Sequence, residues 1–182
     1  MVSIITIFAA LAVPSAVVQL RDRRVQEAAR TIGMIYRQAR MHALGRGSAV
    51  LVRFNGGVMT VLEARVGATT GAQGADCVDL PVSNCNINWA NALLSRQIDG
   101  YQVPTSGEMS TMAVALTDGA DAAIAALDVC FTPMGRSFSR TALAGPLATN
   151  TNAYIAVVSR PGVTRTRRVA LLPNGTARLI AQ

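Results

Sequence analysis

The chain has 182 residues, of which 51% are hydrophobic, 15% are charged and 4% are aromatic. Its abundance of Gly, Ala, Thr and Val suits short strands and loops and argues against a helical bundle. About 160 residues follow an apolar N-terminal stretch, which is enough for one domain with its own core. The formal net charge of +7 favours acidic partners, such as phospholipid headgroups or nucleic acid.

The first 20 residues carry no charged side chain, and the charged run Arg21-Asp22-Arg23-Arg24 follows them directly. About 20 apolar residues are enough to cross a bilayer as a helix. Two alternatives are a secretory signal peptide cleaved near Ala10-Leu11-Ala12, although no basic residue precedes Ile4, and a buried core helix. We expect a membrane and assembly helix, whose main apolar positions are Ile4, Ile7, Phe8, Leu11, Val13, Pro14 and Val17.

The helical pattern continues beyond this charged run without a break. Apolar side chains recur at helical spacing as far as Ala39, and glycines at positions 45 and 47 predict an end near residues 44–47. The expected fold class is α+β, with one long N-terminal helix packed on an antiparallel β-rich head. Residues 1–20 form its membrane half, residues 21–46 its amphipathic half, and residues 47–182 the head.

The rest of the chain contains many short β-branched runs. Residues 48–54 and 58–64 flank Asn55-Gly56-Gly57, which predicts a hairpin with a tight turn. Two further turns share a Pro-x-Gly pattern, Pro133-Met134-Gly135 and Pro173-Asn174-Gly175, and the second should join two antiparallel strands. The remaining strands are expected at residues 97–103, 112–116, 124–132, 153–159, 168–172 and 177–180.

The three cysteines are Cys77, Cys85 and Cys130. With the single histidine, His42, they do not supply the usual four ligands of a structural zinc site, so no metal and no cofactor is expected. A disulfide formed outside the cytoplasm with one thiol left over fits better. The preferred pair is Cys77–Cys85, because it closes a small ring, and the alternative is Cys85–Cys130.

No pattern of catalytic residues stands out. Asp118, Asp121 and Asp128 are near one another in sequence, but charged side chains are mostly exposed, so they are expected to be solvated. His42 is expected to be structural or solvent-facing. No nucleophile-elbow, zinc-protease or phosphate-loop motif occurs, and we expect no enzymatic activity.

Four segments that span most of the chain form a recognisable combination: residues 7–15 (IFAALAVPS), 28–47, 131–136 (FTPMGR) and 167–175 (RRVALLPNG). In these segments the chain resembles the type IV pilin-like proteins, specifically the GspH/FimT group of type II secretion pseudopilins and minor pilins. The family's leader, its cleavage-site Gly, the following Phe and a Glu shortly after are absent. We therefore expect either that the sequence begins a few residues inside that motif or that the protein is a degenerate member of the group.

The resemblance implies a subunit whose helix first lies in the bacterial inner membrane, with the head in the periplasm, and then packs into a periplasmic or surface filament. Its partners would be other pilin-like subunits and the inner-membrane assembly machinery. The main hypothesis is therefore a non-catalytic structural subunit of a type II secretion or type IV pilus filament. An apolar helix can exchange lipid for neighbouring helices, because both surroundings are apolar and packing decides between them.

The alternative is a DNA-binding minor pilin that takes part in DNA uptake. Some FimT-like members carry a Gly-x-x-Arg stretch near the end of the chain, matched here by Gly175 and Arg178. No aromatic residue interleaves these arginines to stack on bases, so nucleic-acid binding is not favoured. The proposed nucleic-acid patch consists of Arg160, Arg165, Arg167, Arg168 and Arg178.

Overall fold

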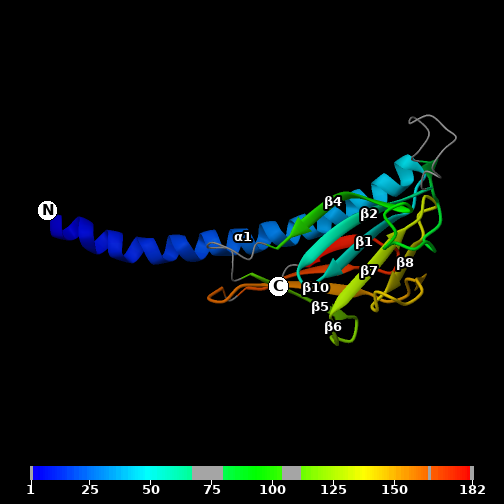
Figure 1. Ribbon diagram of the computed structural model, residues 1–182. Helices are drawn as coiled ribbons and strands as arrows, with labels where there is room; N and C mark the ends of the chain where they lie inside the picture. Colours follow the sequence, from blue (N-terminus) through cyan, green and yellow to red (C-terminus); the bar gives the residue numbers. More distant parts are fainter. Residues whose placement is uncertain (1, 67–79, 104–111, 164, 181–182) are drawn as a thin grey trace.

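The computed structural model describes residues 2–66, 80–103, 112–163 and 165–180, and it describes side chains from residue 17 onward. One helix, α1 (Val2–Arg46), is 45 residues long and continuous. Its first half projects away from the head, and its second half lies along the strands (Figure 1). The fold is α+β, with one N-terminal helix packed on antiparallel sheets, as the sequence predicts.

The helix ends where glycine allows the backbone to turn. Gly47 has φ of 72°, and its N–H donates to the carbonyl of Ala43 at 3.1 Å. A left-handed residue directly after the last turn is the usual way to end a helix, and glycine adopts it at the least cost. The predicted end near residues 44–47 is confirmed.

The head contains two antiparallel sheets in the described chain. The first has the order β3-β2-β1-β7-β8-β9, with β4 also paired to β2. Its strands are β1 (Val50–Asn55), β2 (Val58–Val66), β3 (Leu80–Pro81), β4 (Ser95–Gln102), β7 (Ala126–Phe131), β8 (Ser137–Arg140) and β9 (Ala148–Thr149). The second, in the order β12-β11-β10-β5-β6, contains β5 (Ala113–Asp118), β6 (Ala123–Ile124), β10 (Tyr154–Ser159), β11 (Arg167–Leu171) and β12 (Ala177–Ile180).

Most of these strands lie where the sequence predicts them. The β1–β2 hairpin turns at Gly56 and Gly57, whose φ angles of 57° and 83° are both positive, as a tight hairpin turn requires. The predicted turn at Pro173 joins β11 and β12. The strand expected at residues 124–132 is divided between the end of β6 and β7. The short strands β3, β8 and β9 lie outside the expected ranges, because none of them contains an apolar run long enough to indicate a strand.

The main core lies between α1 and the inner faces of both sheets. Val25, Ala29 and Ile32 of the helix are at most 1% exposed. They pack in one cluster with β1 and β7 of the first sheet and with β10 and β11 of the second. The apolar stripe that the sequence predicts on residues 25–39 is therefore the face on which both sheets pack. Its members are Val25, Ala28, Ala29, Ile32, Ile35, Tyr36 and Ala39.

A second cluster covers the outer face of the first sheet. Residues 82–89 pack in one cluster with Leu51 of β1, and Trp89 donates its indole N–H to the carbonyl of Cys85 at 2.9 Å. Cys85 forms a disulfide with Cys130 of β7, with a Cα–Cα distance of 6.1 Å. The preferred pair Cys77–Cys85 is therefore wrong and the alternative pair is confirmed. The short ring looked favourable, but packing on the sheet brings two cysteines separated by 45 residues together. Cys77 lies outside the described residues.

We expect Cys130→Ala to lower the free energy of unfolding by about 4 kcal/mol, because the lost cross-link closes a loop of this length in the unfolded chain. Urea denaturation measures the change, and Cys77→Ala, which leaves the disulfide intact, serves as the control. Non-reducing peptide mapping should recover Cys85 joined to Cys130. A peptide that joins Cys77 to Cys85 would contradict this pairing.

The turn between β11 and β12 predicts a second effect on stability. Gly175 and Gly162 have φ angles of 76° and 78°, so alanine at either position costs about 1–2 kcal/mol of backbone strain. A Cβ on Gly175 would also lie 2.6 Å from Cε1 of Phe131, whereas one on Gly162 would meet no atom closer than 3.7 Å. In thermal unfolding, the free energy of unfolding of Gly175→Ala should be lower than that of Gly162→Ala by about 1–3 kcal/mol, because of this added overlap. Equal losses would mean that the Phe131 ring moves aside without cost.

Candidate functional site

The described part of the projecting helix is apolar and exposed where it leaves the head. Val17, Val18 and Leu20 are 37%, 49% and 54% exposed. In the part of the chain whose side chains are described, no helix is long and apolar enough to cross a membrane. The predicted membrane half, residues 1–20, lies mostly outside that part, as do the side chains of the assembly positions Ile4, Ile7, Phe8, Leu11, Val13 and Pro14. The division of the helix at residue 20 stays a prediction.

An ion pair ties the helix to the head at this exit. Arg167 of β11 donates from Nη2 to both carboxylate oxygens of Asp22, at 3.1 and 3.0 Å. Arg165 lines a small cavity beside them, together with Val18 and Val163. Arg167 is half-buried, so its charge is balanced within the protein and is not presented to a partner.

The five arginines of the proposed nucleic-acid patch do not gather on one edge. Arg160, directly after β10, is buried, and Arg167 faces α1. Arg168 and Arg178 share the opposite face of their sheet, because Arg168 pairs with Ile180 while Arg178 pairs with Ala170 two positions along. Because side chains alternate along a strand, the sequence neighbours Arg167 and Arg168 lie on opposite faces of the sheet. Of the five arginines, Arg168 and Arg178 share the outer face.

A buried carboxylate organises the outer face of the first sheet. Asp128 of β7 has no exposed surface and accepts bidentate hydrogen bonds from Arg53 of β1, at 2.9 and 2.9 Å. Arg140 of β8 donates to the same carboxylate at 2.9 and 2.7 Å. The hydrogen bond to Asp128 raises the pKa of Arg53. The expectation of a solvated Asp128 is wrong, because cross-strand register places an arginine on each side of it.

A second buried carboxylate lies where α1 ends. Glu63 of β2 is 3% exposed and accepts hydrogen bonds from Ser48 at 2.9 Å and from Arg96 at 2.8 Å. Nε of Arg46, the last helical residue, lies 2.8 Å from the same carboxylate, and Nε2 of His42 lies 3.4 Å away. Burial raises the pKa of Glu63, but the hydrogen bonds from Arg96 and Ser48 and the charge of Arg46 outweigh it and lower the pKa.

Both carboxylates interrupt apolar strand runs, Glu63 in VMTVLEA and Asp128 in ALDVCF. A charged residue within such a run indicates a buried ion pair, because an unpaired charge at that depth is too costly. The sequence shows this signal, but it does not show which arginines are the partners, since each arginine comes from a different element. The structural role expected of His42 fits its place beside Glu63.

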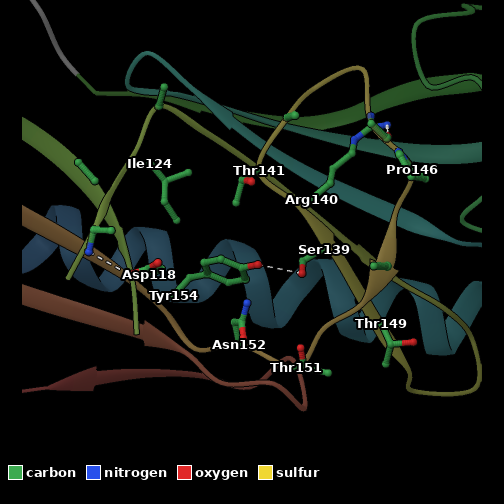
Figure 2. Close-up of a pocket in the computed structure, with 16 residues that line it drawn as sticks. Asp118, Ile124, Ser139, Arg140, Thr141, Pro146, Thr149, Thr151, Asn152 and Tyr154 are labelled. Atoms are coloured by element: carbon green, nitrogen blue, oxygen red, sulfur yellow. Dashed lines mark hydrogen bonds between the residues drawn. The ribbon is translucent and has the colours of Figure 1, made fainter. Parts of the chain in front are cut away.

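A cavity of about 700 Å³ opens between β8 and the starts of β6 and β10 (Figure 2). The hydroxyl of Tyr154 points across it to Ser139, and the two oxygens are 3.1 Å apart. Ser139 also donates to Asn150, and Asp118 accepts the backbone N–H groups of Ala120 and Ala122. Ser139 thus contacts an amide and a phenol in place of a base, and this arrangement does not activate a nucleophile.

Within the described residues, no three His, Cys, Asp or Glu side chains lie close enough together to hold a metal ion. Asp118 and Asp128, which are near in sequence, serve different purposes: one closes a turn and the other pairs with two arginines. The described geometry therefore offers contacts for packing and charge pairing.

No protein-family model and no curated protein matches this sequence. Among solved structures, the chain is similar to two crystal structures of the type IV minor pilin FimU of Pseudomonas aeruginosa strain PAO1. The first is 12% identical with a TM-score of 0.47, over 89% of this chain and 90% of that chain. The second is 13% identical with a TM-score of 0.43, over 85% and 91%.

Glu63 predicts a pH-dependent stability. Its lowered pKa contributes stability above the ordinary glutamate pKa of 4.5, and this stability is lost as the pH falls through the folded-state pKa. We expect Glu63→Gln to reduce the free energy of unfolding at pH 7 by about 2 kcal/mol. The difference between this variant and the wild type should become smaller below about pH 4, where the glutamate itself takes up a proton. Urea denaturation across pH measures it, with the exposed Glu27→Gln as control. A deficit independent of pH would contradict the charge pairing.

Proposed function

We propose that this protein is a non-catalytic structural subunit, a minor pilin or pseudopilin, of a type IV pilus or type II secretion filament. The observation that carries the proposal is that one helix has two different surroundings. From Val25 onward its apolar stripe is buried by the sheets, whereas its first half extends beyond them (Figure 1). The extending half contains no charged residue through position 20.

Such a helical arm requires apolar surroundings from outside the head. About 20 uncharged residues match the thickness of a bilayer, and the same surface can later pack against the arms of neighbouring subunits. The stripe on residues 25–39 already fills the core, so the arm is free to serve assembly. We place the arm in the bacterial inner membrane first and in the filament afterwards.

The chemistry of the head supports a location outside the cytoplasm. A buried disulfide joins Cys85 to Cys130, and disulfides persist outside the reducing cytoplasm. This agrees with a periplasmic head. The sequence resemblance to the GspH/FimT group supports the class of subunit, and the partners it implies are other pilin-like subunits and the inner-membrane assembly machinery.

The test separates the arm from the head. A chain that lacks residues 1–20 should be soluble, monomeric and β-rich by circular dichroism, whereas the full chain should be recovered with membranes. In the full chain, Leu11→Glu places a charge on the arm and should abolish cross-linking to other pilin subunits. The matched control is Met41→Glu, which changes a side chain that is 66% exposed on the half of the helix that packs on the head.

Two outcomes would contradict the proposal. If the shortened chain unfolds, the arm belongs to the core. If the head binds DNA tightly at physiological salt and this binding is lost in the variant R165A/R168A/R178A, the DNA-uptake alternative is favoured. We expect only weak DNA binding that disappears near physiological salt, because scattered phosphate contacts are strongly salt-dependent.

A further inference from the structure

The two Pro-x-Gly turns, far apart in the sequence, lie against each other in the head. Ser137, directly after the first turn, donates its hydroxyl to the carbonyl of Pro173 in the second, at 2.6 Å. Gly175 lies so close to Phe131 that a Cβ would contact its ring. Since Phe131 pairs with Val50 just after α1 ends, this junction lies at the end of the head far from the projecting arm (Figure 1).

A cavity of about 410 Å³ lies at this junction. Arg40 reaches it from α1, Arg136 comes from the first turn, and Asn174 comes from the second. Oδ1 of Asn174 already accepts two hydrogen bonds from Thr176, so its amide N–H groups are what it can offer a ligand. Among the described residues that line the cavity there is no Asp or Glu. The cavity is therefore cationic and rich in donors.

Its two arginines differ from those in the ion pairs of the head. Arg46, Arg53, Arg96, Arg140 and Arg167 each bind a carboxylate. In the described part of the chain, neither the Arg40 nor the Arg136 guanidinium has a hydrogen-bond or ion-pair partner. Arg40 is half-buried, and its Nη2 lies 4.0 Å from where a Cβ on Gly135 would be. Arg136 is exposed, so an anion that enters the cavity would meet two guanidinium groups that no carboxylate of the described residues neutralises.

We propose that this cavity binds a carboxylate of an acidic partner subunit. A guanidinium presents paired N–H donors that match a carboxylate, and such bonds are among the stronger ones in proteins. Two copies of a chain with net charge +7 repel each other, so an acidic subunit fits better than a second copy. The partner class rests on the proposed function, and the position at the end of the head opposite the arm suits contact with the next subunit.

The binding test uses the full chain in a nonionic detergent with a hexaglutamate peptide as the probe, measured by calorimetry at physiological salt. We expect Arg40→Ala with Arg136→Ala to weaken binding about tenfold or more, because charge-assisted hydrogen bonds are lost. The matched control is Arg30→Ala with Arg178→Ala, which removes the same charge from two exposed arginines and should change the affinity by less than about threefold.

A second pair of variants keeps the proposal testable if the arginine variant does not fold. Asn174→Asp places a carboxylate within the cavity, where its oxygen can still accept the bonds from Thr176, and it should abolish peptide binding. Asn152→Asp adds the same charge at another exposed position and should not. If a cavity variant and its matched control lose the same peptide affinity, the binding reflects general charge attraction, and the proposal is overturned.

A wild-type chain that binds no peptide would also overturn it, including the case in which inorganic phosphate alone binds through Arg40 and Arg136. Because the peptide is measured on the isolated chain, this result does not depend on filament assembly. Peptide binding without cross-linking to other pilins would contradict the proposed filament role, and cross-linking without peptide binding would contradict this site.

Discussion

The inner faces of both sheets bury the same stripe of α1 side chains, and the rest of the head depends on that packing. Small residues such as Ala29, Ala39 and Ala43 let the strands approach the helix, while Ile32 fills the space between the sheets. Tight packing of this kind tolerates few changes of volume. The buried stripe of the helix is therefore part of the core of the head, together with the strands of both sheets.

Three carboxylates set the positions of most paired arginines. Asp22 ties β11 to the start of the buried helix, Glu63 ties β2 to its end, and Asp128 links β1 to β8 across β7. Glu63 and Asp128 are buried, and buried charges are costly unless every partner is present, so these two carboxylates favour one register over others. They hold both ends of the buried helix segment at defined places on the sheets.

The positive charge that is not paired with a carboxylate lies mainly on the surface of the head. The chain has seventeen basic and ten acidic residues, and several acidic ones are already used in the interior. Two of the cavities that arginines line differ in character. Arg165, near the exit of the arm, lies next to Asp22, whereas Arg40 and Arg136 line a cavity without an acid among its described residues. This difference, rather than total charge, indicates where an acidic partner would bind.

The sequence by itself determined the continuous helix, its buried stripe, its end at Gly47 and the turns at Gly56, Gly57 and Gly175, because each depends on local periodicity or on a backbone angle that glycine allows. Only the tertiary structure decided which cysteine Cys85 meets, that Asp128 is buried between two arginines, and that the two Pro-x-Gly turns share one cavity. These depend on strand order and register, which bring distant residues together and which local patterns do not encode.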